Sequence, residues 1–274
     1  MAFSGDSRSR GVGATRRGAL ISWGTPTSSG NPSPAPQPEK PQLRKARLNR
    51  RPVYGIAALS LIVLGIVGFV PGMARALFAG HLPPDWIIHV HAAVYWLWLF
   101  LFFVQSITPA LGLMRWHKRI GAGLIAYSVP MFLVGCGVTL NRMVKQIRLG
   151  RLDLAQAMNL EPAVDMVIFP FLFGAAVYFR RNPAIHKRLM IIMATALIYP
   201  AVARIGKPMH FPYFLFYMSP VLIVAGHEYL TERKVHPIYL GGLVLLAVLS
   251  QRMRMLNSAP WLAAIDGLRS LVGP

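Results

Sequence analysis

Long uncharged apolar runs, separated by short basic loops, fill most of the chain after residue 51. The clearest run is Trp86–Met114, which extends for 29 residues without a formal charge, whereas about 20 apolar residues are enough to cross a bilayer. The pattern predicts an all-α fold, a polytopic transmembrane helical bundle of about seven spans. The expected spans cover residues 54–78, 86–114, 120–140, 162–179, 189–205, 209–229 and 235–250.

The chain divides into three parts of different composition. Residues 1–51 are rich in Pro, Ser, Gly and Arg and poor in large apolar residues, so we expect a disordered basic tail. Residues 52–256 hold the predicted spans, and residues 257–274 hold a short segment that we expect at the membrane interface. Its apolar residues at helical spacing are Trp261, Ile265, Leu268 and Val272. The polar stretch 141–161 predicts a second interfacial helix.

The basic residues are placed as membrane topology requires. The net charge is +20, with 29 Lys and Arg against nine Asp and Glu, and ten of the 29 lie in residues 1–51. Most of the others flank apolar runs, where basic residues set the orientation of membrane helices. With the N-terminus inside and seven spans, the cytoplasmic side holds roughly twice as many Lys and Arg as the outer side. We therefore predict a multi-pass protein of the cell inner membrane with a cytoplasmic N-terminus, in contact with the lipid bilayer and not with nucleic acid.

Two of the predicted spans carry a polar stripe on one face. In the span 86–114, polar and aromatic residues recur every three or four positions, and the opposite face is apolar. The span 209–229 repeats this arrangement. Such a stripe turns toward protein, because lipid cannot satisfy its hydrogen bonds. The stripe residues are His91, Tyr95, Trp98, Gln105, His210, Tyr213, Tyr217 and His227, and Arg204 lies at the end of the span before the second stripe.

The eight histidines fall into two layers under this topology, one near each membrane surface. Neutral imidazole is a common ligand of metals and haem, and two opposed histidines suit a b-type haem. Histidines at helix ends also anchor to lipid headgroups, which is the simpler interpretation of those in the loops. The candidate haem ligands are His91 and His210 in the outer layer and His117, His186 and His227 in the inner layer.

The sequence contains few other residues or motifs that indicate a chemical function. Cys136 is the only cysteine, so an intrachain disulfide and a CxxCH haem attachment are excluded. The sequence has no catalytic triad, phosphate loop or zinc motif, specifies no metal, and leaves open whether the protein is an enzyme. Asp165 and Arg204 lie near the outer ends of their spans, where a charged group requires a partner, so they are candidates for an ion pair.

Three motifs resemble a family of uncharacterised bacterial polytopic membrane proteins. They are HVHAAVYWLWLFLFFVQ, WHKRIGAG and IHKRLMIIMATALIYPAVAR, and together they cover about Trp86–Arg204. The resemblance implies a membrane topology and a set of recurring positions, but no reaction. Those positions are His91, Trp98, Gln105, His117, Gly121, His186, Lys187, Arg188, Leu189, Met190 and Arg204.

The sequence leaves three functions open. The first is a redox-linked membrane protein that binds haem or a metal through its intramembrane histidines. The second is a transporter or small-molecule-binding protein that uses the Tyr–Trp–Gln stripe. The third is an assembly factor for respiratory-chain components, in which the basic tail touches anionic lipid.

Overall fold

The computed structural model describes residues 52–81, 85–209 and 213–273, and every regular element in these ranges is a helix. The fold class is therefore all-α, as the sequence predicts. The expected basic tail, residues 1–51, lies outside the described residues. The elements are α2 (Val53–Phe78), α3 (Trp86–Ile107), α4 (Met114–Arg148), α5 (Leu152–Tyr178), η1 (Phe179–Arg181), α6 (Pro183–Leu197), α7 (Tyr199–Met209), α8 (Tyr213–Glu232), α9 (Pro237–Ser250), η2 (Arg252–Met255) and α10 (Ala259–Val272).

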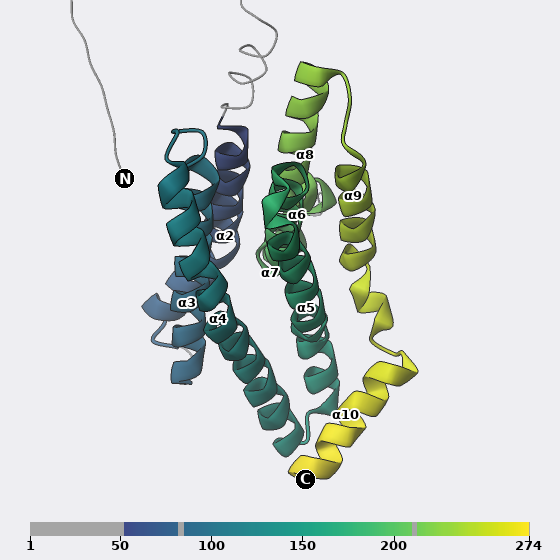
Figure 1. Ribbon diagram of the computed structural model, residues 1–274. Coiled ribbons are helices and arrows are strands. Elements are labelled where there is room, and N and C mark those ends of the chain that lie inside the picture. Colours follow the sequence, from purple (N-terminus) through teal and green to yellow (C-terminus); the bar gives the residue numbers. More distant parts are fainter. Residues whose placement is uncertain (1–51, 82–84, 210–212, 274) are drawn as a thin grey trace, which may run out of the picture. The chain divides into compact units, whose positions relative to one another are not determined.

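Successive long helices run in alternate directions (Figure 1). The turns from α3 to α4, from α5 to α6 and from α8 to α9 lie at one end. We call it the HKR end, because it carries two His-Lys-Arg triplets, residues 117–119 and 186–188. The turn from α4 to α5 and the short helix η2 lie at the opposite end, which we call the Arg252 end.

Four helical segments are long and apolar enough to cross a membrane. They are α2, α3, α4 and the continuous segment formed by α5 and η1. α6 and the first part of α7 meet the same standard together, as one span bent by 47°, which gives up to five. α9 is apolar but has only 14 residues, whereas a span needs about 20. The described residues thus support a multi-pass membrane protein with four or five candidate spans, fewer than the seven expected from the sequence.

Residues 141–161 do not form the separate interfacial helix that the sequence predicted. α4 continues to Arg148 and α5 begins at Leu152, so this polar stretch consists of the ends of two long helices. The turn between them places Gly150 at a φ of +68°, a left-handed conformation that glycine adopts without steric cost. Lys145 and Arg148 occupy the last turn of α4, where cations interact favourably with the helix dipole.

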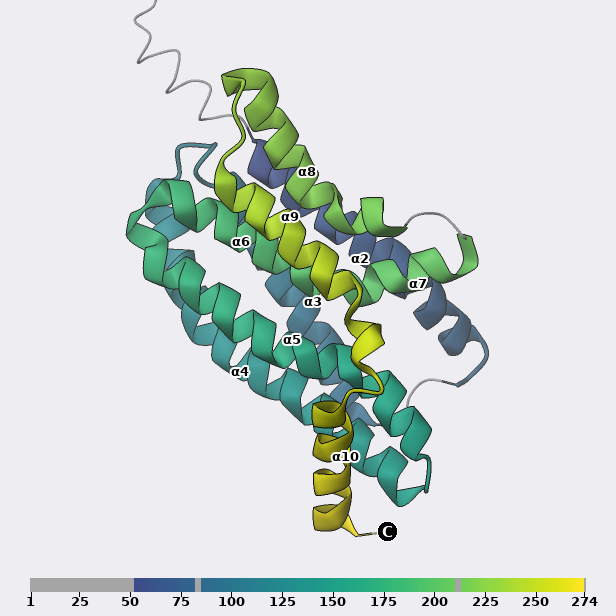
Figure 2. The same ribbon diagram turned by 90° about the vertical axis from the view of Figure 1, so that its right-hand side faces the viewer.

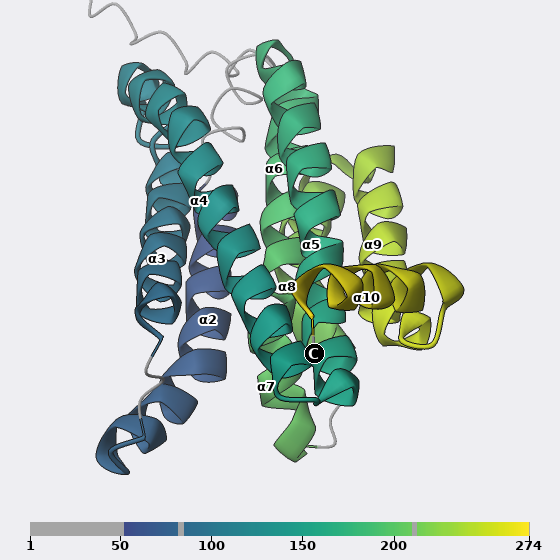
Figure 3. The ribbon, with the colours of Figure 1, turned by 90° about the horizontal axis from the view of Figure 1, so that it is seen from below.

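α6 is the most enclosed helix of the bundle. It contacts α2, α5, α8 and α9. Figure 2 shows α8 and α9 on its near side, and Figure 3 shows α2, α3 and α4 on one side of it and α9 on the other. Every residue from Ile191 to Ala196 is at most 2% exposed, as expected for a helix that is apolar all round. This enclosure fixes which neighbour each residue of α6 meets.

The chain bends by 47° between α6 and α7. Pro200 is the second residue of α7, and its ring and missing N–H oppose continuation of α6 through this point. α7 then approaches α2 closely, because a Cβ atom at Gly68 would collide with the backbone carbonyl of Ala201. The bend and this close contact carry Tyr199 and Arg204 toward the Arg252 end.

The C-terminal segment packs against protein. α10 lies across α4 and α5 at the Arg252 end (Figure 1), and Ile265 in its centre is fully buried. Trp261 and Leu268 on the same face are half-buried, whereas Leu271 is 85% exposed. The helical spacing predicted from the sequence is therefore present, and the bundle itself covers the apolar face.

Candidate functional site

His117 and Gln105 join α4 to α3 at the HKR end. The side-chain Nε2 of Gln105 donates to the backbone carbonyl of His117 at 3.0 Å. In return, His117 Nδ1 lies 3.1 Å from the backbone carbonyl oxygen of Gln105. A carbonyl oxygen can only accept, so Nδ1 must donate, and in a neutral imidazole Nε2 then carries the lone pair. Gly121 packs beside the Gln105 amide, and a Cβ atom there would be 3.7 Å from Nε2.

His186 repeats this arrangement at the start of α6. Its Nδ1 lies 2.8 Å from the Ala176 carbonyl oxygen of α5, so Nε2 is again the nitrogen with the lone pair. His117 and His186 are close enough for their charges to interact. The structure therefore brings together the two histidines that the sequence placed in separate His-Lys-Arg triplets.

The second triplet reaches three different neighbours, because consecutive helical residues are rotated by about 100° from one another. His186 contacts α5, and Lys187 Nζ lies 5.2 Å from the ring centroid of Tyr54 in α2. Arg188 forms an ion pair with Glu228 in α8. Three successive side chains thus fix the N-terminus of α6 against three helices.

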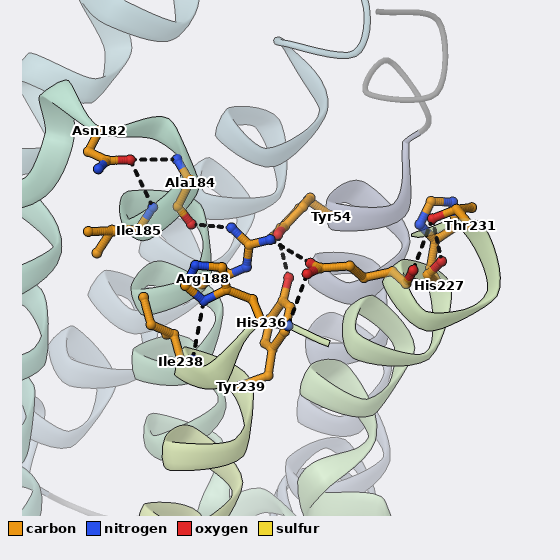
Figure 4. A network of polar contacts seen from close by, with 11 residues as sticks. Tyr54, Asn182, Ala184, Ile185, Arg188, His227, Thr231, His236, Ile238 and Tyr239 are labelled. Atoms are coloured by element: carbon orange, nitrogen blue, oxygen red, sulfur yellow. Dashed lines mark hydrogen bonds and ion pairs between the residues drawn. The ribbon is translucent and has the colours of Figure 1, made fainter. Parts of the chain in front are cut away.

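Arg188 is the centre of a buried polar network (Figure 4). Its Nη2 donates to Glu228 Oε2 at 2.6 Å, and its Nη1 donates to the Ala184 carbonyl at 2.5 Å. The second carboxylate oxygen of Glu228 accepts the backbone N–H of His236 at 3.0 Å. The guanidinium also lies 5.2 Å from the ring centroid of Tyr239. This network connects α6 to α8 and α9.

Two further contacts complete the HKR end. The hydroxyls of Tyr54 and Tyr239 are 2.5 Å apart, which joins α2 to α9 (Figure 4). The Asn182 side chain accepts the N–H groups of Ala184 and Ile185 and so caps α6. The polar groups of this end are therefore largely paired with one another or with the backbone.

An aromatic layer lies between the polar groups of the two ends. Trp98 stacks on Phe102 with ring centroids 5.4 Å apart and meets Phe169 edge-on at 6.5 Å. Phe169 stacks in turn on Phe132 and Phe173. Trp98 is only 4% exposed. This member of the predicted polar stripe thus contributes to core packing.

Arg252 and Asp165 form a second buried ion pair at the Arg252 end. Arg252 Nη1 lies 2.6 Å from Asp165 Oδ1, and the two side chains are 1% and 15% exposed. The guanidinium lies 4.2 Å from the ring centroid of Tyr199. The Tyr199 hydroxyl donates to the Ser250 carbonyl at 3.3 Å. These contacts connect η2 to α5 and α7.

Arg204 is not the partner of Asp165, contrary to the expectation from the sequence. Its Nη1 donates to the Pro200 carbonyl one turn earlier at 2.6 Å, and its guanidinium lies 4.6 Å from the ring centroid of Phe69 in α2. Asp165 pairs with Arg252 because η2 packs against α5 and brings that guanidinium to the carboxylate.

The tyrosines of both predicted stripes lie at the Arg252 end. Tyr217 is fully buried and meets the Tyr199 ring edge-on, with centroids 5.1 Å apart. Tyr213 also interacts with Tyr199. On α3, Tyr95 lies against Gly135 of α4 and is close enough to Asp165 to interact with its charge. The structure therefore gathers these side chains from α3, α7 and α8.

The remaining candidate histidines are placed separately. The His91 ring lies 4.2 Å from the Tyr95 ring, and its Nδ1 is buried without a hydrogen-bond partner. His227 also has a buried, unpartnered nitrogen, Nε2, and lies beside Thr231 on α8 (Figure 4). His210, the expected partner of His91, lies outside the described residues. Within the described ranges, no group of three or more His, Cys, Asp or Glu is arranged to hold a metal ion.

Sequence reasoning missed the partners in both buried ion pairs. The two residues of the Arg188–Glu228 pair are 40 positions apart, and those of the Arg252–Asp165 pair are 87 apart. The available signal was the presence of charged residues beside apolar runs, because each such charge needs a partner. That signal identifies which charged residues need a partner, but it does not show which residue is the partner.

The chain matches no protein-family model, no curated protein and no solved structure. Its function is therefore inferred from the side chains at the two ends of the bundle.

Proposed function

We propose that this protein is a multi-pass protein of the bacterial inner membrane with a cytoplasmic N-terminus and a redox-linked role, in which His117 and His186 hold a b-type haem. Four or five apolar spans support the membrane assignment. The Lys and Arg residues of the tail and of the HKR end support the orientation, because such residues stay in the cytoplasm.

The matched bonding of two imidazoles carries the haem proposal. His117 and His186 come from different helices, interact electrostatically at the same end of the bundle, and both direct Nδ1 to a backbone carbonyl. Ligating histidines typically use this second hydrogen bond to fix the ring and its tautomer, so that Nε2 faces the iron. The two Nε2 atoms would therefore be available to hold a haem iron, and the haem would supply one-electron transfer.

The surrounding residues are suited to hold these two rings in place. Gln105 fixes the orientation of His117 through two hydrogen bonds. The Arg188–Glu228 pair and the Asn182 cap fix the first turn of α6, from which His186 projects. In this proposal, these four residues position the ligands and do not touch the haem.

The pair His91 and His210 remains a proposal for a second haem layer, and His227 remains a further imidazole near the first layer. The His117–His186 pair takes precedence because both rings are described and close to each other. The rival transport role through the stripe is less favoured, since Trp98 packs in the core and Gln105 binds His117. A redox role further implies electron-transfer partners among respiratory-chain components.

A reduced-minus-oxidised absorption spectrum tests the proposal. The full chain is expressed with haem supplementation and purified in detergent, together with His117→Ala, His186→Ala and, as an exposed control, His81→Ala. We expect a Soret band and an α band in the wild type and in His81→Ala, and their loss in the other two variants.

Two results would change this conclusion. Absence of both bands in the supplemented wild type would reject haem binding. Bands that survive in His117→Ala and His186→Ala but disappear in His91→Ala would move the haem to the outer layer.

A further inference from the structure

Arg252 is buried but only partly paired. Its side chain is 1% exposed, and Nη1 engages Asp165 at 2.6 Å. Nε and Nη2 are both buried and have no hydrogen-bond partner. A charged donor left unpaired in the interior is costly, and such groups in native proteins usually bond to a ligand, an ion or a water molecule.

The two unpartnered nitrogens share one edge of the guanidinium. Nε and Nη2 form a planar fork whose two parallel N–H bonds match the two oxygens of a carboxylate. Asp165 does not occupy this edge, because it binds at Nη1. The Tyr199 ring lies 4.2 Å from the guanidinium and covers one face of it, so the fork is held in a fixed plane.

A second buried donor lies in the same cluster. Tyr217 is fully buried, its hydroxyl has no hydrogen-bond partner, and it interacts electrostatically with Arg252, Asp165 and Tyr199. We call these four residues the Arg252 centre. Its unpaired atoms are hydrogen-bond donors with positive charge nearby, so the missing partner is an acceptor with negative charge.

The charges around the Arg252 centre also favour an anion. Asp165 interacts with Glu161, Glu161 with Arg204, and Arg204 with Arg142. Together with Arg252, this chain of interactions holds three cations and two carboxylates. Cations outnumber carboxylates in this set, which favours an anion as the partner.

We propose that the Arg252 centre binds a carboxylate monoanion, with its two oxygens on Nε and Nη2 of Arg252 and the Tyr217 hydroxyl as a third donor. The site lies at the opposite end of the bundle from the His117–His186 pair, so it does not depend on haem binding. The carboxylate belongs either to a small soluble acid or to a fatty acid from the membrane, and both present the same group.

Thermal unfolding of the purified full chain in detergent tests this site. Acetate and octanoate are titrated separately at constant ionic strength, with sodium chloride as the balancing salt. We expect a saturable rise in Tm with at least one carboxylate and none with chloride. A response to octanoate alone identifies a lipid-derived acid, and a response to both identifies a small carboxylate.

Three variants locate the binding. Arg252→Lys keeps the charge but removes the fork, so we expect the apparent Kd to rise about tenfold. Tyr217→Phe removes one donor and should raise the Kd severalfold. Arg254→Lys, an exposed residue of the same short helix, is the matched control and should bind as the wild type does. If Arg252→Lys does not fold, Tyr217→Phe decides the question.

The proposal fails if neither carboxylate raises the Tm of the wild type. It also fails if both carboxylates bind Arg252→Lys and Tyr217→Phe as tightly as the wild type, because binding would then lie elsewhere. Binding that appears only in Glu161→Gln would show that Glu161 itself occupies the fork, which equally overturns an external ligand.

Discussion

The two ends of the bundle each contain a buried arginine paired with a carboxylate at 2.6 Å, yet they differ in how far the arginine is satisfied. At the HKR end, Arg188 uses both Nη atoms, and both oxygens of Glu228 are bonded. At the Arg252 end, one nitrogen of Arg252 is bonded and two are not. Arg188 thus lacks a partner only at Nε, whereas Arg252 lacks partners at both Nε and Nη2.

The contrast extends beyond the two arginines. Most of the buried polar atoms without a partner in the described residues lie at the Arg252 end. They belong to His91, Gln146, Asn159, Tyr217, Arg252, Ser258 and Trp261, whereas the HKR end contributes only atoms of Arg188 and His227. Because an unpaired buried group costs stability, the nearly complete network around Arg188 indicates that it holds the helices in place, and the less complete one around Arg252 indicates a ligand site.

Truncation of Arg188 gives the largest expected effect and tests whether the HKR end is structural. Arg188→Ala leaves the Glu228 carboxylate buried without its cation, so the free energy of unfolding should fall by about 3–5 kcal/mol. Thermal unfolding in detergent measures this loss. Arg181→Ala, at an exposed arginine in the adjacent turn, should change stability little.

A double variant separates lost charge pairing from lost packing at this site. Arg188→Met with Glu228→Leu removes both charges and should recover most of the stability lost in Arg188→Ala. If Arg188→Ala is no less stable than Arg181→Ala, the Arg188 network does not stabilise the fold, and the contrast drawn between the two ends is wrong.

The close contact of α2 with α7 gives the next largest effect. A methyl group at Gly68 meets the Ala201 backbone, which cannot move aside easily, so Gly68→Ala should cost about 1–3 kcal/mol. Gly72→Ala, one turn later with open space around it, should be neutral or slightly stabilising. Equal unfolding temperatures for the two variants would argue against this approach of α7 to α2.

Loss of the α6 cap gives the smallest effect. Asn182→Ala removes the acceptor for two backbone N–H groups and should cost about 1 kcal/mol. Because Asn182 does not touch the haem in this proposal, the haem spectrum should persist while the unfolding temperature falls. Ser270→Ala, at an exposed serine of α10, serves as the comparison and should leave the unfolding temperature unchanged. A loss of the spectrum in Asn182→Ala at unchanged stability would assign Asn182 to the binding site itself.

The helical periodicity correctly predicted the all-α fold and the polar faces of the helices, but it overestimated the number of spans. α9 has 14 residues, and α6 ends at a bend before Pro200, so the apolar runs there do not form straight spans. Hydropathy reports how apolar a run is, whereas length and bending depend on where prolines fall and on what each helix packs against.

The sequence by itself determined that charged and aromatic side chains lie within apolar helices and therefore need protein partners. Only the tertiary structure decided the partners, placing Arg252 rather than Arg204 on Asp165 and His117 near His186. The physical reason is that periodicity assigns a residue to a face of its own helix, while the neighbour on that face is set by the packing of helices distant in the chain.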